Sequence, residues 1–126
     1  MTVKDFYVML FKDFEKTLFE IRMGELLAYS SAAEQVLDRR TAAFMVHKYL
    51  QDILKEDDVA DISPAFRLKD IYECRVCVPH IAQVYIKGIM TDRNLFFGVR
   101  EPLTDEDAEK IKFTLALKSG IIIKNK

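Results

Sequence analysis

Long apolar runs are missing from this chain of 126 residues, and so is an excess of charge of either sign. Charged residues interrupt every apolar stretch, as in the segment 9–15, so we expect no membrane insertion. The 19 Lys and Arg residues nearly balance the 20 Asp and Glu residues, so the sequence predicts no broad positive surface that would attract nucleic acid. Half of the residues are hydrophobic, however, and can bury one core, which predicts a single domain over residues 1–126.

Motifs for catalysis and cofactor binding are also missing. The chain has no glycine-rich phosphate loop, no recognisable pair of catalytic carboxylates and no nucleophile with an ordered partner, so the sequence predicts a non-catalytic protein without a cofactor or metal. The start does not resemble a secretory signal, because charges return directly after the short apolar run 6–11 and no small-residue cleavage site follows. The sequence therefore indicates a cytoplasmic protein unless a leader has been removed.

Helical periodicity dominates the residues that are present. Apolar side chains recur at three- and four-residue steps near the start, which predicts a long amphipathic helix over about 2–23. A second helix is expected to follow Asp38, whose carboxylate can cap it, and to run to about Lys55. Within it we expect His47 to be a surface or half-buried histidine, and the acidic run 56–58 that follows is expected to be solvated surface.

A third helix is expected over 76–87. Its apolar residues, Val76 among them, fall on one side of the helix, and Gln83 is expected to face outward. Gly88 can adopt the left-handed conformation that ends a helix, while residues 89–90 fold back onto the last turn.

A turn-rich loop is expected between this helix and the last one. Pro102 disfavours helix at the residue before it, and Phe97 is expected to be the buried anchor of the loop. Thr104 can cap the last helix through its hydroxyl group, and the acidic residues 105–107 complement the positive end of the helix dipole. The β-branched run 121–123 then predicts a short strand or an apolar tail.

Taken in order, these elements resemble the S-layer homology (SLH) family. The resemblance rests on Leu68-Lys69-Asp70-Ile71, on Lys87-Gly88-Ile89, on Phe97 and on the helix start Leu103 to Ala108. It implies an all-α fold of tandem helix–loop–helix repeats packed with a long N-terminal helix. A degenerate first repeat would lie in residues 1–60 and a second repeat in residues 66–118.

The resemblance implies non-covalent attachment to cell-envelope polysaccharide or to a protein partner, and a cell-envelope location if a leader was removed. In the family, an arginine after the helix cap helps to bind anionic polysaccharide. Arg39 matches that position, whereas Asp105 stands at the downstream one, and Val76 replaces the family's tryptophan. The expected groove lies between the loops at Gly24 and Gly88 and the two helix starts. The candidate ligand-binding residues are Arg39, Arg40, Arg93 and Arg100.

Two other functions fit the sequence. An SLH-like scaffold that has lost its sugar site can serve as a cytoplasmic oligomerisation or adaptor protein. Two repeats in place of the family's three leave apolar faces that either self-association or the long first helix folding back would cover, and we expect a homo-oligomer. Cys74 and Cys77 have the spacing of redox and zinc sites, although no second cysteine pair is present, so a thiol or metal protein is the third hypothesis. The alternative is that Cys77 fills a small core position and Cys74 lies in the loop before the helix.

Overall fold

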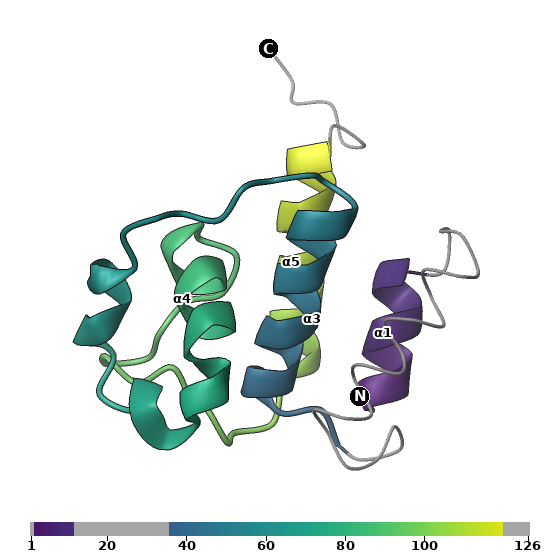
Figure 1. The fold of residues 1–126 in the computed structure, drawn as a ribbon. Helices are drawn as coiled ribbons and strands as arrows, with labels where there is room; N and C mark the ends of the chain where they lie inside the picture. Colours follow the sequence, from purple (N-terminus) through teal and green to yellow (C-terminus); the bar gives the residue numbers. More distant parts are fainter. Residues whose placement is uncertain (1, 12–35, 120–126) are drawn as a thin grey trace.

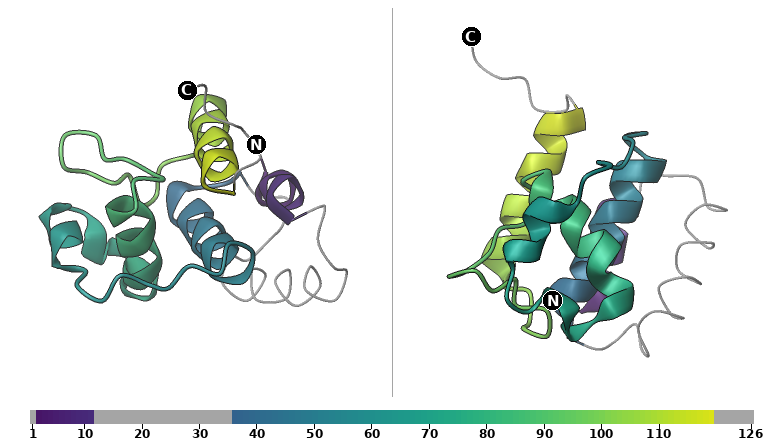
Figure 2. Two further views of the ribbon diagram at one scale, coloured as in Figure 1. Left: turned by 90° about the horizontal axis from the view of Figure 1, so that it is seen from above. Right: turned by 60° about the vertical axis from the view of Figure 1, so that its left-hand side comes forward.

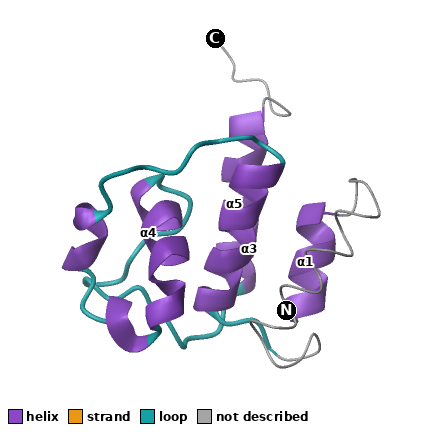
Figure 3. Ribbon diagram, viewed as in Figure 1, coloured by secondary structure: helices purple, strands orange, loops and turns teal. Residues whose placement is uncertain are grey.

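The computed structural model describes residues 2–11 and 36–119. Its α-helices over these ranges are α1 (Val3–Phe11), α3 (Arg39–Asp52), α4 (Val78–Ile86) and α5 (Asp105–Ser119). Three 3₁₀ helices precede α4: η1 (Ser63–Arg67), η2 (Ile71–Glu73) and η3 (Arg75–Cys77). In this part of the chain there are isolated β-bridges but no strands (Figure 3), which confirms the predicted helical character.

Helix α3 lies between α4 and α1 (Figure 1), and α5 runs along a third side of the group (Figure 2). Every α-helix contributes apolar side chains to one shared core. The largest fully buried side chains are Phe6, Leu37, Met45, Leu50, Leu68, Ile71, Ile81, Phe97 and Ile111. None of the helices in the described ranges is long and apolar enough to span a bilayer.

Helix α3 is buried on nearly all sides, as expected for a helix with neighbours on several faces. It begins as predicted, since the Asp38 carboxylate accepts a hydrogen bond from the Thr41 amide at 2.9 Å. It ends at Asp52, three residues before the predicted end. Lys55 has a positive φ of 56°, and the amide of Glu56 turns back to the Leu50 carbonyl at 2.9 Å.

The end of α4 follows the prediction. Gly88 has φ +76°, and the amides of Ile89 and Met90 both donate to the Val84 carbonyl, at 2.9 and 3.2 Å. Both side chains are buried, so the chain folds back onto the last turn of the helix. Thr104 caps α5 as predicted, because its hydroxyl oxygen accepts from the Asp107 amide at 3.1 Å. Phe97 is buried in the loop between α4 and α5, which confirms its predicted place.

Two predictions about the α4 segment are wrong. Val76 is 72% exposed, because the segment before Val78 forms the 3₁₀ helix η3 and does not continue the face of α4. Gln83 is buried, not outward-facing. Its side-chain amide bonds both backbone groups of Val59, accepting at 2.8 Å and donating at 2.9 Å, so its polar atoms are satisfied inside the protein.

The segments that lead into α3 and α5 lie side by side. The Leu103 amide donates to the Leu37 carbonyl at 2.8 Å, and the Arg39 amide donates to the Glu101 carbonyl at 2.9 Å. These bonds bring the two helix starts together although they are far apart in the sequence. The predictions for residues 12–23, the Gly24 loop and residues 121–123 lie outside the described residues.

Candidate functional site

A cavity of about 540 Å³ opens between α5 and the loop that follows α4. Residues 88–91 line one side, residues of α5 between Glu106 and Thr114 line the other, and Arg39 contributes from the start of α3. Of the residues in the predicted groove and its ligand set, Gly88 and Arg39 line this cavity, whereas Asp38 and Thr104 do not and the Gly24 loop lies outside the described residues.

Arg39 is the residue that holds the cavity walls together. Its side chain is 3% exposed, and its Nε donates to the Phe97 carbonyl at 2.7 Å while Nη2 donates to the Thr91 carbonyl at 2.6 Å. Its Nη1 donates to Asp107 Oδ2 at 3.0 Å. Burial lowers the pKa of the guanidinium, and the charge of Asp107 opposes that effect. A Cβ at Gly98 would lie 3.2 Å from Arg39 Cδ, so a glycine allows this close approach.

The other three predicted ligand arginines are also paired with carboxylates. Arg93 pairs with Asp107 at 3.0 Å, so Arg39 and Arg93 share this carboxylate, although Arg93 itself does not line the cavity. Arg40 pairs with Asp38 at 3.0 Å, and Arg100 Nε lies 3.4 Å from Glu73. An anionic ligand would therefore have to compete with a carboxylate of the protein at each of these arginines.

The charge around the cavity is slightly negative. Three carboxylates and two cations line it: Glu106, Asp107, Glu109, Arg39 and Lys110. Partial burial raises the pKa of Asp107, but the charges of Arg39 and Arg93 and the hydrogen bonds with Thr104 outweigh it, so the pKa is lowered and the group stays ionised at neutral pH. A cationic or apolar ligand group suits this cavity better than an anionic one.

Asp70 holds the loop between α4 and α5 from the side opposite to Arg39, a role that the sequence pattern did not reveal. Its buried carboxylate accepts hydrogen bonds from the amides of Phe97, Gly98 and Val99, at 2.8, 2.8 and 3.0 Å. The available signal was an aspartate next to the apolar Ile71 in a motif of the resembled family. Asp70 therefore positions the loop that Arg39 holds from the other side.

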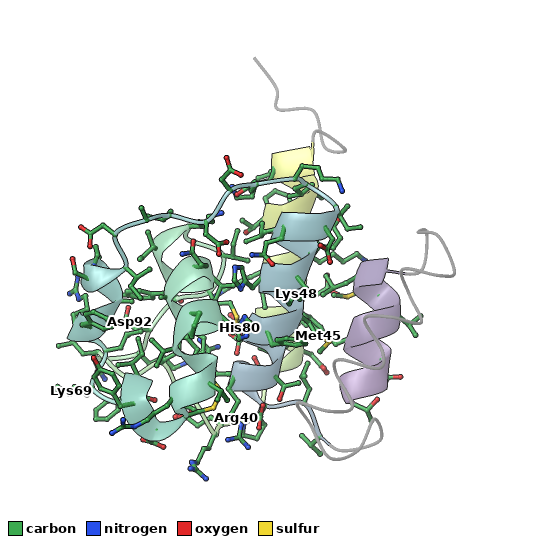
Figure 4. The ribbon with its side chains drawn as sticks, viewed as in Figure 1. Arg40, Met45, Lys48, Lys69, His80 and Asp92 are labelled. Carbon is green, nitrogen blue, oxygen red and sulfur yellow. A yellow bond between two sulfur atoms is a disulfide. The ribbon has the colours of Figure 1, made fainter. Side chains whose placement is uncertain are left out.

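His47 of α3 meets His80 of α4, which is labelled in Figure 4. His47 Nδ1 lies 2.8 Å from His80 Nδ1, and His47 Nε2 donates to Asp58 Oδ1 at 2.7 Å. His47 is buried, so the prediction of a surface or half-buried residue is wrong. Asp58 belongs to the acidic run that was expected to be solvated only. It is exposed as expected, but it also anchors the histidine pair.

Acidification is expected to destabilise the protein through His80. Burial, together with the charges of His47 and Lys48, lowers its pKa from 6.5 to about 4. Between pH 4 and 6.5 the unfolded chain therefore binds more protons than the folded protein does. The contribution of neutral His80 to the free energy of unfolding is complete above pH 6.5 and is lost as the pH falls toward 4. Because His80 is partly exposed, we expect a loss of roughly 1 to 2 kcal/mol.

Urea unfolding at several pH values between 7 and 4 measures this loss. The matched variant His80→Gln keeps an amide that can donate to His47 but does not titrate, so its free energy of unfolding should change less over the same range. Asp58 titrates below this window, because its pKa is lowered from 3.8. Burial raises this pKa, but the hydrogen bond and the charge of His47 lower it by more than burial raises it. Equal slopes for the two proteins would contradict the prediction.

Cys74 and Cys77 form a disulfide at the start of α4. Cys77 is fully buried, which confirms its predicted core position, and Cys74 is partly exposed in the preceding turn. Over the described ranges, no group of three or more His, Cys, Asp or Glu side chains is placed to hold a metal ion.

A second surface feature lies on the 3₁₀ helices and the neighbouring loop. We call Phe66, Tyr72 and Phe96 the aromatic patch, and each of them is between 45% and 61% exposed. The rings of Phe66 and Tyr72 stack with centroids 5.9 Å apart. The amino group of Lys69, labelled in Figure 4, lies 5.5 Å from the Phe96 ring centroid. Each exposed ring of the patch therefore has one neighbouring side chain in contact with it at the surface.

Comparison with protein-family models finds none that matches this chain, and comparisons with curated proteins and with solved structures find no match either.

Proposed function

We propose that this protein is a non-catalytic, SLH-like binding module that attaches to a protein partner through the cavity between residues 88–91 and α5. The cavity is the observation that carries the proposal, because it lies beside the helix start where the resemblance implies a ligand groove. Its walls are held in place by buried bonds from Arg39 and Asp70, so the site is formed before a partner arrives.

The pairing of the two helix starts supports the two-repeat interpretation. Leu37 and Leu103 occupy the same place before their helices and are joined by a backbone hydrogen bond. Asp38 and Thr104 follow them, and each caps its helix with a side-chain oxygen. Two equivalent helix starts in contact are what tandem repeats would produce.

The charges favour a protein partner over an anionic polysaccharide. Carboxylates outnumber cations around the cavity, and the nearby arginines are already paired. Phe113 is 55% exposed at the cavity and offers an apolar contact. A peptide segment with an apolar side chain next to a lysine or arginine matches both features.

NMR titration with short probe peptides tests the proposal. We expect an alternating Leu-Lys peptide to shift the amide signals of residues 88–91 and 106–114, an alternating Leu-Glu peptide to shift them less, and purified anionic wall polysaccharide to leave them unchanged. Phe113→Ser should weaken binding of the Leu-Lys peptide about tenfold, because it removes apolar contact area. Phe96→Ser removes an exposed phenylalanine outside the cavity and should leave binding unchanged.

Two outcomes would overturn this proposal. Shifts at residues 88–91 with the polysaccharide alone would favour the envelope-glycan function. An absence of shifts with all three probes would remove the cavity as a binding site.

A homo-oligomeric or adaptor protein is the second candidate function, and the aromatic patch favours it. Contiguous exposed apolar side chains often mark a protein interface. If a second copy covers the patch, the solution mass should exceed that of the monomer, and the double variant Phe66→Ser, Tyr72→Ser should shift it to the monomer. A monomeric mass for the unmodified protein over a wide concentration range would remove this candidate.

A further inference from the structure

We propose that the Cys74–Cys77 disulfide is a thiol-exchange site that small thiols of the glutathione class can open and close. This activity is independent of the proposed binding function. The bond joins residues three apart in the sequence, between the end of η2 and the start of α4. Both cysteines are in the bond, so their chemistry depends on which sulfur an incoming thiolate reaches first.

The two cysteines differ strongly in access. Cys74 is partly exposed, whereas Cys77 is fully buried in the core. The residues between them, Arg75 and Val76, are exposed, so within residues 2–11 and 36–119 no other segment covers this turn. The positive charge of Arg75 also favours the approach of an anionic thiolate. Attack is therefore expected at Cys74 Sγ.

The position of Cys77 favours its release. Burial of Cys77 disfavours a charge on its sulfur, but Cys77 is the N-cap residue of α4, where the positive end of the helix dipole opposes that cost for a leaving thiolate. In the first step, the external thiolate forms a bond to Cys74 Sγ, the bond between the two cysteines breaks, and Cys77 leaves as a thiolate that takes up a proton. A second external thiolate then forms a bond to the small-thiol sulfur of the mixed disulfide, the bond to Cys74 Sγ breaks, and Cys74 leaves as a thiolate that takes up a proton. Two small thiols are thus joined in one disulfide for each protein disulfide reduced.

The bond is poorly suited to a purely structural role. A disulfide that closes a loop of four residues constrains the unfolded chain less than one that closes a long loop. The neighbouring Ile71 and Ile81 are buried by contacts with the rest of the core. We therefore expect the reduced protein to keep its fold, which an exchangeable bond requires.

Equilibration with mixtures of reduced and oxidised glutathione tests the proposal. After acid quenching and alkylation, mass spectrometry should show the folded protein passing from disulfide to dithiol as the mixture becomes more reducing, with an unchanged far-UV circular dichroism spectrum. A bond that is reduced only after addition of urea, or a loss of helical signal on reduction, would overturn the proposal.

Single variants test which sulfur reacts. Cys77→Ser retains Cys74 and should form a mixed disulfide with oxidised glutathione at least about tenfold faster than Cys74→Ser, which retains only the buried Cys77. If a variant does not fold, a brief alkylation of the reduced unmodified protein gives the same answer. Trypsin cleaves after Arg75 and places the two cysteines on separate peptides. Equal labelling of both peptides, or faster labelling of Cys77, would contradict the mechanism.

Discussion

Replacement of Asp70 by alanine is expected to lower the free energy of unfolding by about 3 to 5 kcal/mol. The carboxylate accepts hydrogen bonds from three consecutive backbone amides, all of them buried. Hydrogen bonds to charged groups contribute about 1.5 to 3 kcal/mol each, and buried donors without an acceptor carry a further penalty. Because the three bonds share one acceptor group, their losses do not add in full.

Urea unfolding of three variants separates this effect from a general effect of losing a charge. Asp70→Asn keeps the shape and one acceptor oxygen, so its loss should be roughly half that of Asp70→Ala. Asp92→Ala is the matched control in the loop that Asp70 holds, where the Asp92 carboxylate accepts from one backbone amide, that of Leu95, at 2.9 Å and from the Tyr85 hydroxyl at a longer 3.4 Å. We expect Asp92→Ala to lower the free energy of unfolding by about 1 kcal/mol. A similar loss for Asp70→Ala and Asp92→Ala would contradict the prediction.

Replacement of Arg39 by alanine is the second large change, with an expected loss of about 3 to 5 kcal/mol. The guanidinium bonds two carbonyl groups and Asp107 while being 3% exposed. Alanine would leave these acceptors without their donor and would empty the space beside Gly98. Arg39→Lys keeps the charge, but a lysine cannot place its donors in the planar fork of a guanidinium, so we expect more than half of the loss to remain.

Arg40 provides the control for Arg39. Its side chain is one-third exposed and pairs with Asp38. Arg40→Ala should therefore change the free energy of unfolding by less than about 1 kcal/mol. Unfolding by urea measures all three variants, and an effect of Arg40→Ala as large as that of Arg39→Ala would overturn the assignment of Arg39 as the residue that holds the loop.

The local features of the fold could be read from the sequence. The cap at Asp38, the helix end at Gly88 and the cap at Thr104 depend on partners within six residues, and each signal is contained in the short segment around it. The burial of Phe97 was also predicted. An aromatic side chain in a turn-rich loop favours a buried anchor, but composition alone does not distinguish Phe97 from the adjacent Phe96, which is 45% exposed.

The long-range polar contacts could not be read in the same way. Asp70 binds amides 27 to 29 residues away, and the acceptors of Arg39 lie 52 to 68 residues away. The two histidines that meet are 33 residues apart. Nothing in the segments around these residues specifies the distant group, because only the packing of the helices brings the partners together. Periodicity failed at Gln83 for the same reason, since its buried amide is satisfied by the distant Val59.

The hydrogen bond from Leu103 to Leu37 has a consequence for synthesis on the ribosome. The start of α3 is held by a segment that is translated much later, so the N-terminal half cannot complete its native contacts while it emerges. Contacts of such wide sequence separation slow folding, because a long chain segment must be closed before they form. We therefore expect nascent chains that stop before Leu103 to remain sensitive to protease, and chains that extend past the end of α5 to become resistant.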